Sequence, residues 1–374
     1  MRSLLVLIDG LGDEPIAAFG GQTPFAKAIH PHIDSLAAAG KLSAVSICEN
    51  DITPESCSCI LRLLGVDKKD MPHNRAYMEL LAHNRDISEY EMVLRCNLVA
   101  VDDTGKLAAF NGQGLTPKEM GQAAAACDAI FKDIEFIHLS EYRNLLVLNK
   151  EQGILGCAVP PPHESIGGDV YDLLAELRSK SLSLNYFLQE AEKRLAPFSK
   201  KSLRYMLYPW GASAREELPR FYDLHHLQGG AVCKAEIVRG IAKALHMEIC
   251  VPQGATGDVD TNVAAKAAAT VQLLEKNDFV IAHFNGSDEA AHRYDASGKA
   301  AFIEKIDREF MAAILANITE PLKIVICGDH VTSSVTGRHG KGAVPVVAAA
   351  INMDRRTIAI NSYHDILKFL MREE

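Results

Sequence analysis

Residues 1–10 read MRSLLVLIDG, and the apolar run in this stretch, LLVLI at 4–8, stops at Asp9. A continuous apolar run is typical of a strand that is buried on both faces of a mostly parallel sheet. Runs of the same kind recur at 144–148, 248–251, 279–284, 323–327 and 344–351. Helical patterns at 262–275 and 298–315 lie between some of these runs. This alternation predicts an α/β fold with a mostly parallel sheet sandwiched by helices.

Polar residues follow three of these runs at the point where each predicted strand ends. Asp9 follows the first run, residues 285–288 (NGSD) follow the run at 279–284, and residues 328–330 (GDH) follow the run at 323–327. His339 lies shortly beyond the last of these. In open α/β sheets, ligands bind outside the carboxyl ends of the strands. We therefore expect these side chains to face one crevice.

The polar residues at these strand ends are of the types that bind metal ions. Asp288 and His292 are four residues apart, so both lie on one face of a helix, and Asp329 and His330 are adjacent. Carboxylates and imidazoles together suit Zn²⁺, Mn²⁺ or Mg²⁺. Taken alone, an Asp/His pair four residues apart is more often a solvated helix face, and an Asp-His dipeptide after a strand is also explained by a helix cap. Their occurrence at several strand ends, with Asp9 at another, favours a metal site.

The middle of the chain has a different character. Residues 70 to 235 are charged and rich in turns, with PPPHESIGGD at 160–169 and a polar helical pattern at 170–200. The ligand-bearing strands lie on both sides of this segment. The sequence therefore predicts a discontinuous core, 1–70 and 236–374, and a smaller α+β domain inserted at 71–235.

Composition limits the class of protein. The net charge of −9 and the isoelectric point near 5.9 argue against a nucleic-acid or membrane partner, so an anionic substrate needs a local positive site. The first apolar run is too short for a signal peptide, and no apolar stretch has the length of a membrane span. The nine cysteines show no paired spacing. We expect reduced, mostly buried thiols in a cytoplasmic protein.

Ser56 lies in TPESCSCILRLLG (53–65), where a turn leads into a helical pattern. Ser56 is a candidate N-cap of this helix. A helix N-terminus also binds anions, and a serine beside a divalent cation can attack phosphorus, so a nucleophilic role is compatible with the same position. Cys57 and Cys59 are expected to be packing residues.

Several motifs, taken in order, resemble a known family. They are DGLGD (9–13), GQTP (21–24), Pro54 and Ser56 with LLGVD (63–67), RCN (95–97), GATG (254–257), DEAAH (288–292), IEKIDRE (303–309), and GDH (328–330) with His339. Together they resemble the archaeal-type cofactor-independent phosphoglycerate mutases of the alkaline phosphatase superfamily. The resemblance covers nearly the whole chain and implies an alkaline-phosphatase-like core with an inserted cap domain that binds substrate.

The resemblance implies two divalent metal ions (Mn, Zn or Mg) and no requirement for 2,3-bisphosphoglycerate. The implied ligands are Asp9, Ser56, Asp329 and His330 for one ion, and Asp288, His292 and His339 for the other. Ser56 would be the nucleophile of a phosphoglycerate mutase, forming a phosphoserine that returns the phosphoryl group to a different hydroxyl. Two such ions stabilise both the attacking and the leaving oxygen.

The implied substrate is a small phosphorylated metabolite, held in the family by arginines of the cap domain. Arg75, Arg95 and Arg143 stand at matching positions here, and His163 falls where relatives carry Asp-Pro-His. Arginine suits this task because its guanidinium binds carboxylate and phosphate groups in a bidentate manner.

The chain departs from the family pattern at three places. Relatives have Gly-Ser-Asp where this chain has Glu55-Ser56-Cys57, the stretch AFNGQGL (109–115) lacks the expected arginines, and Trp210 stands where an arginine is expected. These departures keep open a related phosphatase or a small-molecule phosphotransferase of the homoserine-kinase type. A non-catalytic metal-binding scaffold is a further alternative, which the full ligand set disfavours. The oligomeric state is left open.

Overall fold

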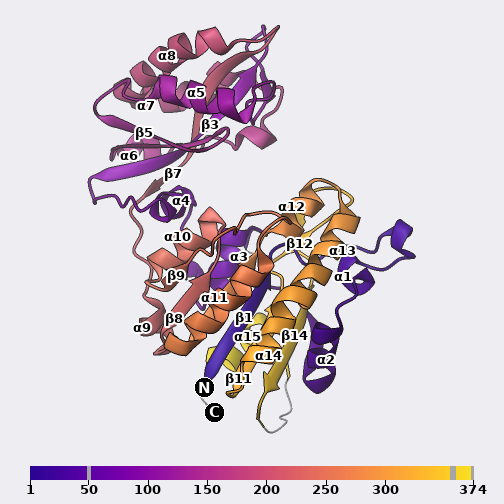
Figure 1. The fold of residues 1–374 in the computed structure, drawn as a ribbon. Helices are drawn as coiled ribbons and strands as arrows, with labels where there is room; N and C mark the ends of the chain where they lie inside the picture. The colour runs from indigo at the N-terminus through magenta and orange to yellow at the C-terminus, as the bar shows by residue number, and fades with distance from the viewer. Residues whose placement is uncertain (49–51, 354–358, 372–374) are drawn as a thin grey trace. The chain divides into compact units, whose positions relative to one another are not determined.

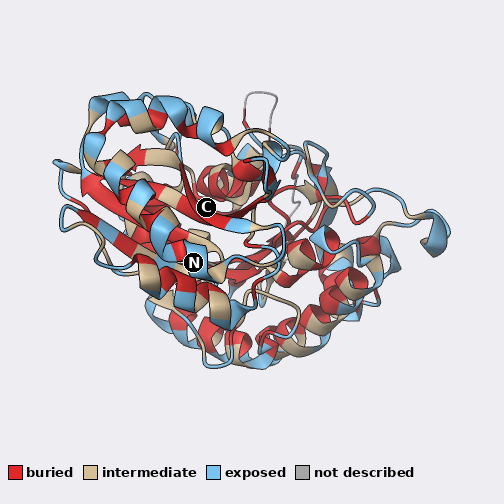
Figure 2. Cartoon of the chain, turned by 90° about the horizontal axis from the view of Figure 1, so that it is seen from above, coloured by how far each residue is buried: buried red, intermediate tan, exposed pale blue. Residues whose placement is uncertain are grey.

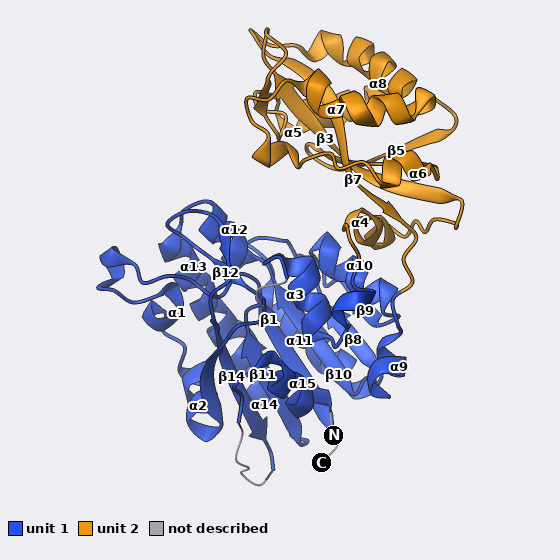
Figure 3. Ribbon diagram, turned by 180° about the vertical axis from the view of Figure 1, so that it is seen from behind, with its two compact units in different colours: residues 1–71, 218–374 blue, residues 72–217 orange. Residues whose placement is uncertain are grey.

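The computed structural model describes residues 1–48, 52–353 and 359–371. The chain forms two compact units: Met1–Met71 with Leu218–Glu374, and Pro72–Glu217 (Figure 3). The sequence had placed the second boundary after residue 235. Residues 218–235 lie in the first unit because β8 (Gly229–Val232) is hydrogen-bonded, in parallel, to β10 (Phe279–Phe284) of that unit.

The first unit is built on a sheet that has seven strands among the described residues, in the order β2-β14-β11-β1-β10-β8-β9. The central strand β1 (Arg2–Ile8) pairs in parallel with β10 and with β11 (Leu322–Cys327). β9 (Glu248–Cys250) continues the parallel set beyond β8. On the other side, β14 (Val344–Ile351) is antiparallel to β11 and to β2 (Lys41–Val45). The predicted mostly parallel sheet is confirmed.

Helices cover both faces of this sheet (Figure 1). Leu4, Val6 and Ile8 of β1 pack in one core with side chains of α2 (Pro31–Ala39), α11 (Val263–Lys276) and α13 (Ala296–Lys305). The other face is covered by α3 (Ser56–Leu63), α10 (Glu236–Ala244) and α15 (Tyr363–Met371). The inner strands β1, β10 and β11 are buried along almost their whole length, and Figure 2 colours buried residues red, which explains their continuous apolar sequences. The predicted fold class is confirmed.

The remaining elements of the first unit are short or continue a helix already named. The helix predicted at 298–315 is observed as α13, a π-helical segment (Ile306–Met311) and α14 (Ala312–Asn317). The other elements are α1 (Pro24–Lys27), α9 (Phe221–His225), α12 (Gly286–His292), β12 (Val331–Thr332), β13 (His339–Gly340) and the 3₁₀ turns Ala17–Phe19 and Lys68–Asp70.

The second unit is built on an antiparallel sheet. Its strands are β3 (Glu91–Val101), β4 (Leu107–Ala109), β5 (Ile134–Ser140), β6 (Arg143–Asn149) and β7 (Arg204–Ala214). Its helices are α4 (Ala76–Ala82), α5 (Pro117–Cys127), α6 (Gln152–Leu155), α7 (Val170–Lys180) and α8 (Leu182–Leu195), with 3₁₀ turns at Pro162–Glu164 and Ala196–Phe198. β3 lies between β6 and β7 and pairs with both.

The apolar run at 144–148 corrects one sequence inference. It was assigned to the parallel sheet, but it forms β6 of the antiparallel sheet. β6 is an interior strand whose residues Asn144–Leu148 are buried, so it has the same continuous apolar sequence as a parallel strand. Burial on both faces, and not strand direction, produces this pattern.

Two of the nine cysteines also depart from expectation. Cys48, which follows β2, and Cys59 on α3 form a disulfide, with a Cα–Cα distance of 6.2 Å. The prediction of reduced cysteines throughout, with Cys59 a mere packing residue, is therefore wrong for this pair, because the fold returns α3 to the end of β2. No helix in the described part of the chain is both long and apolar enough to span a bilayer.

Candidate active site

The carboxyl ends of three neighbouring strands gather the predicted site residues of the first unit. Asp9 follows β1, Asp288 lies on α12 directly after β10, and Asp329 and His330 follow β11. Since β1 lies between β10 and β11 and all three are parallel, these residues lie at one edge of the sheet. His339 is returned to the same edge because β13 pairs with β12, with Thr332 opposite His339.

The side chains form two overlapping groups that could each hold a cation. The candidate ligand atoms of Asp9, Asp329 and His330 lie within 4.8 Å of one another, and so do those of Asp288, His330 and His339. His292 adjoins the second group: its Nε2 atom is 3.2 Å from Oδ2 of Asp288 and 3.1 Å from Nε2 of His339. The structure thus brings together every metal-ligand candidate of the sequence analysis.

Ser56 lies beside the first group. Its Oγ atom is 3.4 and 3.3 Å from the two carboxylate oxygens of Asp9 and 3.3 Å from Nε2 of His330. Helix α3 begins at Ser56, and its N-cap is Glu55, whose side chain makes no capping hydrogen bond. The predicted N-cap role of Ser56 is therefore wrong. Its hydroxyl is directed to Asp9 and His330. Because Ser56 is the first residue of the helix, the backbone N–H groups of the first turn, which have no partner within a helix, are close to this hydroxyl.

The electrostatics of the two groups differ. Burial, together with the negative charges of Asp329 and Asp288, raises the pKa of Asp9 well above its usual value. Burial acts in the same direction on Asp288, but hydrogen bonds from His292 and His339 outweigh it and hold the pKa of Asp288 well below its usual value. In turn, the hydrogen bond to Asp288 raises the pKa of His292 to about 9.

These residues fit a divalent cation. Oδ1 of Asp329 accepts hydrogen bonds from the backbone N–H groups of Gly10 (3.1 Å) and His330 (3.0 Å). Oδ2 of Asp329 is buried and accepts no hydrogen bond, so it is oriented but unsatisfied. Burial also lowers the pKa of His330, which keeps the imidazole neutral and able to bind a metal. Three buried carboxylates at one place are unfavourable unless a cation is bound among them.

His283 is a residue of the site that the sequence did not predict. It lies inside the apolar run of β10, is fully buried, and has Nε2 3.0 Å from Oδ2 of Asp9. Burial lowers the pKa of His283 to about 3, so the neutral ring donates its N–H to the carboxylate and fixes the orientation of Asp9. The only signal in the sequence is a histidine within an otherwise apolar strand.

Thr332 and Gly10 link the two groups. The hydroxyl of Thr332 donates to Oδ1 of Asp288 (2.6 Å) and lies 3.1 Å from Nδ1 of His330. Gly10 has φ +62, and a Cβ atom there would lie 2.6 Å from Oγ1 of Thr332 and 2.8 Å from Oδ1 of Asp288. Only glycine allows the loop after β1 to approach these two side chains so closely.

A fully buried ion pair lies between the loop after β1 and the loop after β11. The Nζ atom of Lys299 is 2.8 Å from Oδ2 of Asp13, and both side chains are 0% exposed. Lys299 also donates to the backbone oxygens of Gly12 (3.0 Å) and Thr332 (2.8 Å). One ammonium group therefore connects the loop after β1 to the loop after β11.

The predicted substrate residues lie in the second unit. Arg75 and Arg95 both contact Glu79, and the guanidinium carbon of Arg95 is 4.0 Å from the ring centroid of Trp210. The ring of His163 lies 6.1 Å from that of Trp210. Arg143 lies on β6 and donates from Nη2 to Oγ of Ser140 (2.8 Å).

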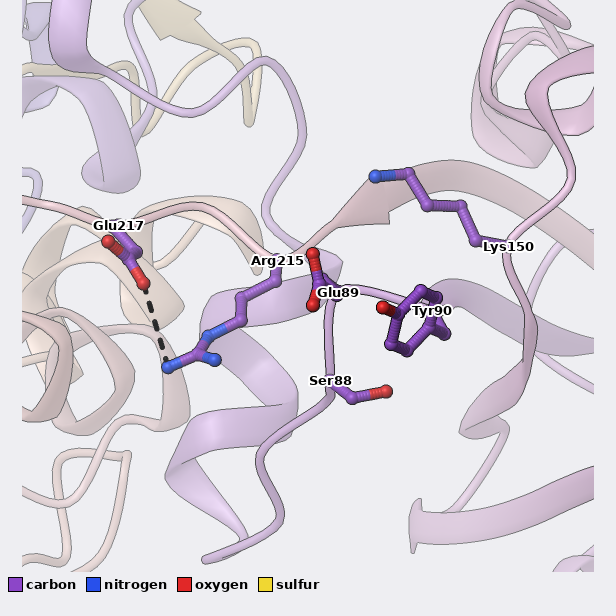
Figure 4. A pocket seen from close by; sticks show the side chains of 6 residues that line it. All are labelled: Ser88, Glu89, Tyr90, Lys150, Arg215 and Glu217. Atoms are coloured by element: carbon purple, nitrogen blue, oxygen red, sulfur yellow. Dashed lines mark ion pairs between the residues drawn. The ribbon is translucent and has the colours of Figure 1, made fainter.

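A cavity of about 460 Å³ in the second unit contains none of these predicted residues. Its lining side chains are Ser88, Glu89, Tyr90, Lys150, Arg215 and Glu217 (Figure 4). Arg215 pairs with Glu217 across 3.8 Å, and the cations and acids of the lining balance. Its lining therefore does not identify it as the substrate site.

Comparison with known proteins agrees with this geometry. A model of the Metalloenzyme superfamily matches residues 1–367. A 2,3-bisphosphoglycerate-independent phosphoglycerate mutase of Thermococcus kodakarensis is 30% identical to the chain, over 93% of this chain and 88% of the relative. A relative of the same name from Methanothrix thermoacetophila is 27% identical, over 93% and 91%.

Solved structures show the same fold along the whole chain. A protein of Pyrococcus horikoshii is 25% identical and superposes with a TM-score of 0.77, over 99% of this chain and 96% of that one. The cofactor-independent phosphoglycerate mutase of Thermoplasma acidophilum is 20% identical, with a TM-score of 0.63 over 99% of both chains, and shares the fold. The family predicted from the motifs is confirmed: this chain belongs to the metalloenzyme superfamily and, within it, to the 2,3-bisphosphoglycerate-independent phosphoglycerate mutase family.

Proposed function

We propose that the chain is a cytoplasmic, metal-dependent phosphoglycerate mutase that interconverts 3-phosphoglycerate and 2-phosphoglycerate through a phosphoserine at Ser56, without 2,3-bisphosphoglycerate. The observation that carries the proposal is the position of Ser56 Oγ, 3.3 Å from both Oδ2 of Asp9 and Nε2 of His330. The shared name of the curated relatives supports the choice of substrate.

Two divalent ions, of the Mn, Zn or Mg type, would be held by the residues described above. Asp9, Ser56, Asp329 and His330 would bind one ion, and Asp288, His292 and His339 the other. When bound, such ions favour the ionised serine and neutralise the charge of the phosphoryl group in transfer. The buried, unpartnered Oδ2 of Asp329 supports this assignment.

The side chains of the protein would carry out the transfer itself. Oγ of Ser56 attacks the phosphorus of 3-phosphoglycerate, and the bond from phosphorus to the 3-oxygen of glycerate breaks. The proton that Ser56 loses is balanced by the one that the departing 3-hydroxyl gains. The 2-hydroxyl of glycerate then attacks the phosphoserine and releases Ser56. The N-terminal amides of α3 would hold the phosphoryl oxygens throughout.

The second unit carries the proposed substrate-binding residues. Arg75, Arg95, Arg143 and His163 are proposed to contact the carboxylate and the phosphoryl group. A strongly acidic chain needs such a local positive site to hold an anion, and guanidinium groups suit both partners.

A ³¹P NMR time course tests the proposal. The protein is incubated with 3-phosphoglycerate and Mn²⁺, without 2,3-bisphosphoglycerate or nucleotide, and 2-phosphoglycerate should appear. Ser56→Ala should abolish the conversion. Ser58→Ala, two residues along the same helix with its Oγ 3.3 Å from Oε1 of Glu55, is the matched control and should retain it.

The other outcomes of this experiment separate the alternatives. Inorganic phosphate alone would identify a phosphatase. An unchanged spectrum that responds only when nucleotide and an alcohol are added would identify a phosphotransferase of the homoserine-kinase type. No turnover of any phosphoester in the presence of metal would leave a metal-binding scaffold.

A further inference from the structure

Two arginines of the second unit share one buried carboxylate. Nε of Arg75 lies 3.0 Å from Oε1 of Glu79, and Nε of Arg95 lies 3.1 Å from Oε2 of the same residue. The side chain of Glu79 is 8% exposed and that of Arg95 is 12% exposed. Nε of Arg95 donates a hydrogen bond to Oε2 of Glu79, whereas Nε of Arg75 forms an ion pair with Oε1 and donates no hydrogen bond. One carboxylate thus lies between the two guanidinium groups.

The strand register places an aromatic ring on one of these guanidinium groups. Arg95 on β3 is directly opposite Trp210 on β7, so both side chains lie on the same face of the sheet. The guanidinium carbon of Arg95 is 4.0 Å from the centroid of the Trp210 ring. Nε1 of Trp210 donates to Oδ1 of Asn97 (3.0 Å), and Nδ2 of Asn97 donates to the backbone oxygen of Phe110 (3.1 Å). These hydrogen bonds hold the ring in place.

The opposite face of the same sheet belongs to the core. Met92, Leu94 and Cys96 of β3 pack there with apolar residues of α5, α7 and α8. Arg95 lies on the other face of β3, where Trp210 also packs against this core and Glu79 reaches Arg95 from α4. Burial lowers the pKa of Arg95 to about 10, so its charge is unfavourable here unless negative groups lie close to it.

We propose that Glu79 is a positioning residue and Trp210 a specificity-determining residue of a subsite that binds the carboxylate end of the substrate. The inference rests on the proposed function and gives roles to two residues to which the family resemblance assigned none. Glu79 orients the guanidinium groups of Arg75 and Arg95, and Trp210 covers one face of Arg95, so a ligand reaches that guanidinium along its edge. A planar carboxylate suits this approach.

The charge of the subsite selects the same end of the substrate. Two guanidinium groups and one carboxylate leave a single net positive charge. That charge matches a carboxylate and is less than a phosphoryl dianion requires. The ring of His163, whose pKa is lowered by burial, adds a neutral wall 6.1 Å from Trp210.

Trp210 is the only tryptophan of the chain, so its fluorescence reports on this subsite without turnover. D-Glycerate, which has the carboxylate but no phosphoryl group, should change the emission of the intact, metal-loaded protein in a saturable way. Glycerol, which lacks the carboxylate, should leave it unchanged at the same concentration. Equal responses to both compounds, or no response to D-glycerate, would overturn the proposal.

Variants separate positioning from folding. Glu79→Gln should weaken D-glycerate binding about tenfold or more, because the neutral amide no longer forms ion pairs with both guanidinium groups. Trp210→Ala should raise KM for 3-phosphoglycerate with little change in kcat, and Trp210→Phe should restore part of the loss through its aromatic face. Glu192→Gln, which affects a different pair with Arg178 in the same unit, is the matched control and should bind as the wild type does.

The two proposals fail in distinguishable ways. D-Glycerate binding with no mutase activity would leave the subsite standing and contradict the proposed function. If the wild-type protein is a mutase and the Glu79→Gln variant has the same KM for 3-phosphoglycerate, the proposed subsite is contradicted and the proposed function is not. A Glu79→Gln variant impaired equally in binding and in thermal stability would assign Glu79 a structural role and contradict the inference.

Discussion

Oγ of Ser56 lies 3.3 Å from Nε2 of His330, although 274 residues separate the two in the chain. The contact joins the first residue of α3 to the loop that follows β11, two elements from opposite ends of the first unit's sequence. The contact depends on the tertiary fold and not on the local sequence of either segment. β14 is antiparallel to both β11 and β2, so the carboxyl end of β2, which precedes α3, and that of β11 lie at the same edge of the sheet.

Metal removal tests the ligand set. Divalent metal should raise the melting temperature of the chelator-treated wild-type protein, with a stabilisation of about 2.7 kcal/mol when free metal reaches about a hundred times its Kd. Asp329→Asn should abolish that shift because it removes the oriented, unpartnered oxygen. Asp34→Asn, an exposed acid on α2, should keep it. A full metal-induced shift in Asp329→Asn would contradict the ligand assignment.

The buried pair of Lys299 and Asp13 should be a major stabilising feature of the active-site loops. Lys299→Met leaves the Asp13 carboxylate buried without its cation and should lower the free energy of unfolding by about 3–5 kcal/mol. Adding Asp13→Leu should recover much of that loss. Arg308→Met removes an exposed pair with Glu309 and should change stability by less than about 1 kcal/mol. Denaturant unfolding measures all of these, and a loss for Lys299→Met no larger than for Arg308→Met would refute the idea.

The disulfide between Cys48 and Cys59 makes stability depend on redox state. Its sequence separation of 11 residues corresponds to about 3 kcal/mol of stabilisation when oxidised. A reducing agent should therefore lower the unfolding free energy of the oxidised wild-type protein by about that amount, and Cys48→Ser should not respond to it. A wild-type protein insensitive to the reducing agent would show that the bond does not form in solution.

Lys266 should make stability depend on pH in the alkaline range. It is 1% exposed on α11, its Nζ donates to the backbone oxygen of His283 (2.6 Å), and burial lowers its pKa to about 8. The unfolded lysine titrates near about 10.4, so between these values the unfolded state binds a proton that the folded state does not. The unfolding free energy should therefore rise with pH across that window, by up to about 3 kcal/mol.

Lys266→Met removes the titrating group and isolates its contribution. Its unfolding free energy should lie above that of the wild type below pH of about 8 and converge with it toward about 10.4. Urea titrations across this range measure the difference. A constant difference between the two proteins at every pH would show that the folded pKa of Lys266 is not lowered.

The candidate site was predictable where it depends on strand ends. Asp9, Asp288, Asp329 and His330 stand directly after apolar runs, and parallel strands must deliver their carboxyl ends to the same edge of the sheet. The run at 144–148 shows the limit of the same pattern, because it reports burial and not strand direction.

Other features depend on contacts that no local pattern encodes. His283 and Lys299 read as ordinary members of a strand and a helix, and their partners, Asp9 and Asp13, lie near the other end of the chain. The joining of Cys48 to Cys59 requires the tertiary return of α3 to the end of β2. Ser56 was misassigned as the N-cap because helix starts are uncertain by a residue when read from sequence.

In the proposed reaction, Ser56 carries the phosphoryl group between two hydroxyls. Rapid acid quenching of the metal-loaded protein with 3-phosphoglycerate, followed by peptide mapping by mass spectrometry, identifies the phosphorylated residue. Phosphate should be found on Ser56 at times shorter than one turnover, and none should be found in the Ser56→Ala variant. Conversion of 3- to 2-phosphoglycerate at full rate by Ser56→Ala, or phosphate on another residue of the wild type, would contradict this reaction.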